Sequence, residues 1–237
     1  MYTITTHEAE YTMHPQRGKH PSRCNVNAFY HMQKSIAPYK AYWQHVSAIL
    51  PAYLMDESNG TLILYDDGSI EQVNHTIKYV LDDWLSYHQS STDTLRKQSM
   101  QWLGSKNQRR VPMILGHNLC LLPVQVRKGR SRNHAMTGYV ILNKVKNIYT
   151  RHSFRAAGST LALSDAGDYT DNAAVIKFSD QLYLQAIDCK HTVENNLSIA
   201  MDMVRHYCAE RSLDTMPFFS SSHQPQEPYS PTHEKNL

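Results

Sequence analysis

The sequence predicts an α+β fold: a mostly antiparallel sheet with hairpins, one helix near residues 76–88 and a C-terminal amphipathic helix near residues 192–210. Short runs of β-type residues, separated by turn residues, fill the middle of the chain. Apolar residues recur at helical spacing after residue 76 and again after residue 192. Because the β-type runs follow one another rather than alternating with helices, an antiparallel sheet is favoured over a parallel one.

The first strong local signal is a β-hairpin. Residues 61–65 and 69–73 are rich in Leu, Ile and Val, and they flank the pair Asp67-Gly68. Such a pair between two β-type runs is typical of a tight hairpin turn, because glycine adopts a positive φ at little steric cost.

A helix and a series of strands are expected after this hairpin. Asn74 or Thr76 is a candidate N-cap for the helix, whose apolar positions are Ile77, Val80, Leu81, Trp84 and Leu85. Further strands are expected at residues 111–115, 119–124, 138–145, 160–163, 175–178 and 182–187. The last helix is expected to open at Thr192, with one apolar stripe made by Val193, Leu197, Ala200, Met201, Val204, Tyr207 and Cys208.

The two ends of the chain differ from its middle. Residues 1–25 are polar, and residues 213–237 are rich in Ser, Pro, Gln and His, so both are expected to be poorly ordered. Residues 26–212 are expected to form a single domain. The chain lacks the long apolar run of a membrane span and the apolar core of a signal peptide, and its four cysteines form no CxxC pair. These features predict a reduced, cytoplasmic protein outside the membrane.

Charge is distributed very unevenly along the chain. Residues 94–164, here called the basic segment, contain 13 Lys or Arg and no Asp or Glu. The other 166 residues carry the remaining 11 basic groups and all 21 acidic ones. A solvated charged face is the ordinary explanation for a short basic run. Over so long a segment, the pattern instead predicts a surface for a polyanion, and nucleic acid is the commonest polyanion.

The candidate DNA-binding residues of this segment fall into small clusters. They are Arg96, Lys97, Lys106, Arg109, Arg110, Arg127, Lys128, Arg130 and Arg132. Residues 127–134 are expected to form an exposed loop that follows phosphates or places an Arg in an A·T-rich minor groove. No zinc-finger spacing, RNP1-like string or KH-type loop occurs. No helix pair with the character of a helix-turn-helix is evident within the basic segment.

Catalytic and metal motifs are missing from the sequence. The 14 His residues form no HExxH or zinc-finger spacing, and Asp165, Asp168 and Asp171 lack the pattern of a calcium loop. No GxSxG, Walker A or GxGxxG string occurs. A non-enzyme without metal or other cofactor is therefore expected. The alternatives are a metal-dependent nucleic-acid-processing enzyme that uses these aspartates, or a module that binds RNA or an acidic protein.

Several short segments, taken in order, match the pattern of a known family. They are Trp84-Leu85-Ser86-Tyr87, Ser90-Ser91, Arg96-Lys97, Trp102-Leu103-Gly104, Val111-Pro112-Met113-Ile114, Leu121-Leu122-Pro123-Val124, Gly138-Tyr139-Val140-Ile141-Leu142, Phe178-Ser179 and Glu194-Asn195. Through this order, over about residues 50–210, the chain resembles a diverged member of the competence transcription factor family (ComK-like proteins of Gram-positive bacteria). The family's glycines beside the serine pair are absent, since no Gly lies between Gly68 and Gly104.

The resemblance implies a specific function. Family members activate DNA-uptake genes and bind paired A·T-rich boxes through the minor groove, as dimers that pair into tetramers. It therefore implies double-stranded DNA as the ligand, a homo-oligomer, a nucleoid-associated location and RNA polymerase as a partner. Family members are also controlled by adaptor-assisted proteolysis, but the adaptor-binding tail motif of some members is not visible here, and Met216-Pro217-Phe218-Phe219 is only faintly similar to it.

Overall fold

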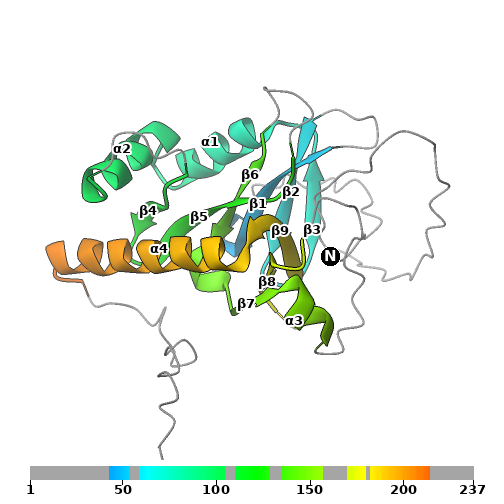
Figure 1. Ribbon diagram of the computed structural model, residues 1–237. Helices are drawn as coiled ribbons and strands as arrows, with labels where there is room; N and C mark the ends of the chain where they lie inside the picture. Colours follow the sequence, from blue (N-terminus) through cyan, green and yellow to red (C-terminus); the bar gives the residue numbers. More distant parts are fainter. Residues whose placement is uncertain are drawn as a thin grey trace, which may run out of the picture.

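The computed structural model describes residues 43–53, 59–104, 110–128, 135–156, 170–179 and 182–213 (Figure 1). These residues form an α+β fold with two antiparallel sheets, which confirms the predicted fold class. The two chain ends predicted to be poorly ordered lie outside the described residues, as does the strand expected at 160–163.

The larger sheet has six strands in the order β3-β2-β1-β6-β5-β4. They are β1 (Val46–Tyr53), β2 (Asn59–Tyr65), β3 (Ile70–Val73), β4 (Met113–Gly116), β5 (Leu119–Gln125) and β6 (Thr137–Ile141). The smaller sheet has the order β7-β8-β9. It contains β7 (Asn147–Thr150), β8 (Ala173–Lys177) and β9 (Tyr183–Cys189). The helices in the described part are α1 (Ile77–Tyr87), α2 (Thr92–Trp102), α3 (Arg151–Ala156) and α4 (Lys190–Glu210).

The β2–β3 hairpin is confirmed, and its turn explains the Asp-Gly pair. The amide N–H of Gly68 donates to the carbonyl of Tyr65 at 3.1 Å, and the N–H of Tyr65 donates to the carbonyl of Ser69 at 2.9 Å. Gly68 has a φ of 86°, as the last residue of a three-residue hairpin loop requires. The Asp67 carboxylate accepts from the Ser69 N–H at 2.8 Å and holds the turn closed.

Two consecutive helices, α1 and α2, follow this hairpin, although only α1 was predicted. The chain leaves α1 through Gln89, which has a φ of 54°. The N–H of Ser90 donates to the carbonyl of Leu85, and that of Gln89 to Ser86, which is the hydrogen-bond pattern of a Schellman motif. The motif usually has glycine in the place of Gln89. Because this glycine is missing, the sequence has no local signal that a helix ends here. Ser91 then caps α2 by accepting from the N–H of Thr94 at 3.3 Å.

Helices cover both faces of the larger sheet (Figure 1). On one face, α1 packs on β1 and β2 while α2 packs on β4, and Trp84 donates from its indole nitrogen to the carbonyl of Trp43 at 3.1 Å. On the other face, α4 contacts β4 and β5 and also the strands of the smaller sheet. The core on this side contains Leu50 and Leu122 of the larger sheet and Leu184 of the smaller one.

One expected strand needs correction, and two strands, β1 and β7, were not predicted. The strand expected at 138–145 ends at Ile141, where Leu142–Lys144 form a 3-10 turn before the chain enters β7 in the other sheet. β1 was not predicted. Its otherwise apolar run contains Pro51, and proline is rare in central strands. The structure accommodates this proline because β1 pairs with β6 only through Ala48 and Ile49.

The C-terminal helix is confirmed and begins at Lys190, two residues before the predicted Thr192. No helix within the described ranges is long and apolar enough to cross a membrane.

A pH-dependent contribution to stability is expected from Glu71. Burial raises the pKa of this carboxyl above its usual 4.5, and a hydrogen bond from the Tyr65 hydroxyl (2.7 Å) offsets part of the increase. The folded protein therefore binds this proton more tightly than the unfolded chain, so stability falls as pH rises through the raised pKa. Glu71→Gln, which keeps an acceptor for Tyr65, should raise the Tm at pH 7 and match the wild-type Tm below about pH 4. An equal Tm difference at both pH values, measured by thermal denaturation, would contradict this cause.

Candidate nucleic-acid interface

Three strand ends within the basic segment meet at one end of the larger sheet. The antiparallel register pairs Met113 with Leu121 and Gln125 with Thr137, so the start of β4, the end of β5 and the start of β6 lie together. Arg110 precedes β4 and Lys128 follows β5, which brings both to this end. Of the other predicted DNA-binding residues, Lys106, Arg109, Arg130 and Arg132 lie outside the described residues.

Helix α2 brings two more cations toward this end. Its buried residues, Leu95 and Ser99, face the sheet, and the Ser99 hydroxyl donates to the carbonyl of Pro112 at 2.5 Å. With α2 held in this way, Arg96 is half-buried against the strand ends while Lys97 is exposed to solvent. The two neighbouring cations therefore occupy different environments.

A small pocket lies between α2 and the ends of the three strands. Its volume is about 40 Å³, and its lining consists of Arg96, Arg110, Val111, Met113, Pro123, Thr137 and Tyr139. Burial raises the pKa of the Tyr139 hydroxyl, the charge of Arg96 offsets part of this increase, and Asp82 adds slightly to it. The hydroxyl consequently keeps its proton at neutral pH. Two guanidinium groups and two hydroxyls at one small pocket are donors suited to an oxyanion.

An ion pair with Asp188 fixes the position of Arg110. One guanidinium nitrogen, Nη1, donates to both carboxylate oxygens of Asp188, at 2.8 and 2.6 Å. The same carboxylate accepts from the backbone N–H of Gln125 at 2.7 Å. The Asp188 side chain is 8% exposed, whereas that of Arg110 is 34% exposed. Because Asp188 belongs to β9, this contact ties the smaller sheet to the end of the larger sheet where β4 starts and β5 ends.

Arg127 has a structural position, so the prediction that places it in an exposed loop is wrong for this residue. It is 1% exposed. Its Nε donates to the carbonyl of Ala135 at 2.6 Å, and its Nη2 donates to Asn59 Oδ1 at 2.9 Å. The guanidinium also lies 4.0 Å from the ring centre of Tyr53. These contacts join the ends of β1, β2, β5 and β6 and keep Arg127 inside the fold.

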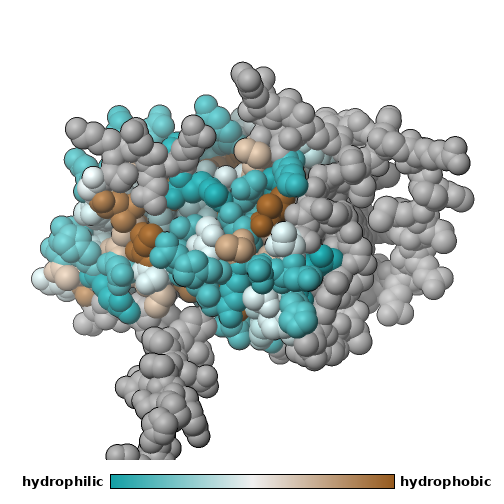
Figure 2. All heavy atoms as spheres, in the orientation of Figure 1, coloured by the Kyte–Doolittle hydropathy of each residue, from teal (hydrophilic) through white to brown (hydrophobic). Residues whose placement is uncertain are grey.

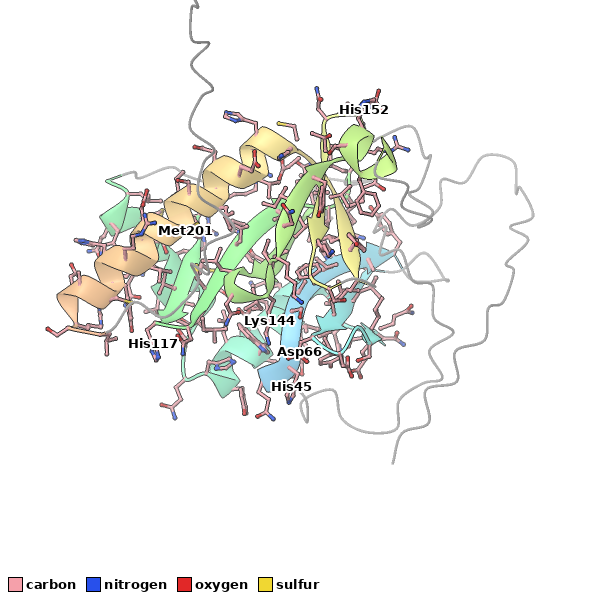
Figure 3. All side chains as sticks on the ribbon, turned by 90° about the horizontal axis from the view of Figure 1, so that it is seen from below. His45, Asp66, His117, Lys144, His152 and Met201 are labelled. Atoms are coloured by element: carbon pink, nitrogen blue, oxygen red, sulfur yellow. The ribbon has the colours of Figure 1, made fainter. Side chains whose placement is uncertain are left out.

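A second ion pair lies at the opposite end of the larger sheet. Figure 3 shows Lys144, Asp66 and His45 close together, and Lys144 Nζ lies 2.9 Å from Asp66 Oδ2. His45 Nδ1 is 3.3 Å from the same oxygen. Asp66 belongs to the sequence before the basic segment, as Asp188 belongs to the sequence after it. Carboxylates from both flanks therefore neutralise part of the basic segment's charge in the folded protein.

The described residues offer little support for a metal-dependent catalytic site. Within the described ranges, no group of three or more His, Cys, Asp or Glu side chains is placed to hold a metal ion. Asp165 and Asp168 lie outside those ranges, and Asp171 is exposed. The face of the molecule over α4 is mainly hydrophilic, with small separate hydrophobic spots (Figure 2).

Sequence reasoning missed the two hydroxyls of the pocket. Thr137 and Tyr139 are alternate residues of β6 and so share one face of the strand. The placement of Arg96 above that face depends on α2, which was not predicted. The Ser91-Thr92-Asp93 segment, with a good N-cap and an acidic first turn, is the signal that could have identified this helix.

Comparison with known proteins identifies no relative. No protein-family model, no curated protein and no solved structure matches this chain. The function must therefore be inferred from the chain's own residues and their arrangement.

Arg127 and Lys128 should respond very differently to the same substitution. Arg127→Gln leaves buried acceptors unpaired and should lower the free energy of unfolding by about 2–4 kcal/mol. Lys128→Gln, at an exposed neighbouring position, should change it by less than about 0.5 kcal/mol. Urea denaturation of the two variants measures this difference. Equal changes would show that the Arg127 contacts do not stabilise the fold.

The Asp188–Arg110 pair should contribute measurably to stability. Asp188→Ala removes the acceptor of both Arg110 and the Gln125 N–H, and a loss of about 2–3 kcal/mol of unfolding free energy is expected. The matched control is Asp202→Ala, which removes an exposed pair with Arg205 (2.6 Å) and should cost below about 0.5 kcal/mol. If both variants unfold at the same urea concentration as the wild type, the Asp188–Arg110 pair does not contribute to the free energy of unfolding.

Proposed function

We propose that the protein is a DNA-binding transcription activator without catalytic activity, which contacts A·T-rich duplex DNA through phosphates and minor-groove edges. The observation that carries the proposal is the segregation of charge: the basic segment holds 13 cations and no carboxylate. Among its described cations, Arg96, Arg110 and Lys128 come from separate parts of this segment to one end of the larger sheet. Convergence of this kind supports a binding surface more strongly than the composition does alone.

The residue types in and beside this surface suit the minor groove. Narrow A·T-rich grooves concentrate negative potential and attract arginine, while Asn and Gln read groove edges by hydrogen bonds. The segments next to Arg110 and Lys128 contain Asn107, Gln108 and Asn133 together with further arginines. A surface made from strand ends and one helix does not depend on a single recognition helix. This favours contacts with phosphates and the minor groove.

The resemblance to the competence transcription factors extends the proposal to a biological role. On this basis the protein activates DNA-uptake genes as a homo-oligomer, in the cytoplasm and at the nucleoid, with RNA polymerase as a partner. These parts of the proposal rest on the order of the matching segments. The charge segregation supports DNA binding independently of them.

The direct test is a fluorescence-anisotropy titration against an A·T-rich duplex, a G·C-rich duplex and a single-stranded RNA of equal length. Binding should be tightest to the A·T-rich duplex. If about five phosphates are neutralised, affinity should fall on the order of several hundredfold between about 50 and 200 mM salt. Netropsin, which occupies the A·T minor groove, should compete with the protein.

Other results would redirect the proposal. Failure of the wild-type protein to bind any duplex at low salt would overturn it. A preference for the RNA probe would favour an RNA-binding module, and cleavage of plasmid DNA only with added Mg²⁺ would favour a nucleic-acid-processing enzyme.

A further inference from the structure

We propose that the pocket between α2 and the ends of β4, β5 and β6 seats one phosphodiester group of the DNA backbone, with Arg96 as its principal donor. The inference rests on the proposed function and specifies where this end of the sheet holds its ligand. Four observations carry it: the size of the pocket, the donors that line it, its charge balance and the contrast between Arg96 and Lys97.

The size of the pocket selects the kind of group that it holds. A volume of about 40 Å³ has room for roughly three water molecules. This is enough for the oxygens of one phosphate, whereas pockets for drug-sized ligands have volumes of about 300–1,000 Å³. The pocket therefore suits a small group, such as a single anionic group of a longer chain.

Donors line this space from α2, from β6 and from the segment before β4. Arg96 on α2 lines the pocket and has no hydrogen-bond or ion-pair partner among the described residues. Its side chain is half-buried, so its positive charge is partly removed from water. A bound oxyanion would supply the partner for this charge. Thr137 and Tyr139 place hydroxyls on β6, and Arg110 lines the same space while Asp188 holds its Nη1. Hydrogen bonds between a charged donor and a phosphate oxygen are about twice as strong as neutral ones.

The charges around the pocket favour a singly charged anion. The two arginines contribute two positive charges, and Asp188 balances one of them at 2.6 Å. Asp82 also acts on the pocket, since its charge is felt at the Tyr139 hydroxyl. It is held nearby by a hydrogen bond from Thr92 Oγ1 at 2.7 Å. The excess positive charge at the pocket is therefore at most one, and Asp82 lowers it further. A phosphodiester carries one negative charge, whereas free phosphate near neutral pH carries up to two, so a second negative charge would have no cation to pair with.

The neighbouring cations Arg96 and Lys97 provide a matched pair for the test. Arg96→Gln and Lys97→Gln each remove one positive charge from adjacent positions of α2, so their effects on long-range attraction are nearly the same. If Arg96 holds a phosphate in the pocket, Arg96→Gln should weaken binding to the A·T-rich duplex by about 10- to 100-fold. Lys97→Gln, at an exposed position, should weaken it by about two- to fivefold. Thermal denaturation of both variants checks that the fold is intact.

Two substitutions that leave the net charge unchanged test the contribution of the pocket's hydroxyl groups apart from that of its positive charge. Thr137→Val and Tyr139→Phe keep the net charge and remove only hydroxyls, and each should weaken duplex binding by about three- to tenfold. Inorganic phosphate at millimolar concentration should leave the wild-type Tm no higher than an equal ionic strength of chloride does.

The outcomes distinguish this inference from the proposed function. Duplex binding by the wild type, with equal losses in Arg96→Gln and Lys97→Gln, would overturn the phosphate seat and leave the DNA-binding function standing. A phosphate-specific increase in Tm that Arg96→Gln abolishes, together with equal DNA affinities of the two variants, would assign the pocket to free phosphate and overturn the inference. The absence of wild-type duplex binding would overturn both proposals.

Discussion

The larger sheet is buried on both faces, and this constraint determines where every other element can lie. All eight residues of β1 are buried, and those of the central part of β5 are buried too. Such strands need a cover on each side, because apolar surface left in water would cost about 25 cal/mol per Å². The α1–α2 pair supplies one cover, and α4 with the smaller sheet supplies the other (Figure 1). Polar groups that bind a ligand are then restricted to the ends of the sheet and the outer sides of the helices.

The separation of charge along the sequence is only partly preserved in space. Lys144 and Arg110, both in the basic segment, pair with Asp66 and Asp188 from outside it. Arg127 is buried and bonds to a carbonyl and an amide oxygen. Among the residues that the structure describes, Arg96, Lys97 and Lys146 form no ion pair, and they lie at half-buried or exposed positions. A count of cations therefore overstates the binding surface, and pairing across the fold decides which of them face a ligand.

The parts of the fold that sequence could predict are those in which local physics and tertiary structure agree. The β2–β3 hairpin follows from Gly68, and α4 follows from a long apolar stripe. β1 and α2 were not predicted. Pro51 and Gln89 stand where local rules expect other residues, and the N-cap signal at Ser91 was the local evidence for α2. In each case tertiary packing outweighs a preference worth only a few kcal/mol at most. For the candidate site, Arg96 and Arg110 were identified from charge alone, whereas Thr137 and Tyr139 become neighbours of Arg96 only through the packing of α2 on β4.

The ion pair between Asp188 and Arg110 also affects the entropy that Arg110 would lose on binding a ligand. An arginine normally loses rotamer freedom when it meets a ligand, at a cost of about 0.5–1.5 kcal/mol for an immobilised long side chain. Arg110 is already ordered by its partner, so most of that entropy is lost during folding. If this end of the sheet binds a phosphate, as we propose, Arg110 would meet it with its guanidinium already oriented and its charge shared with Asp188.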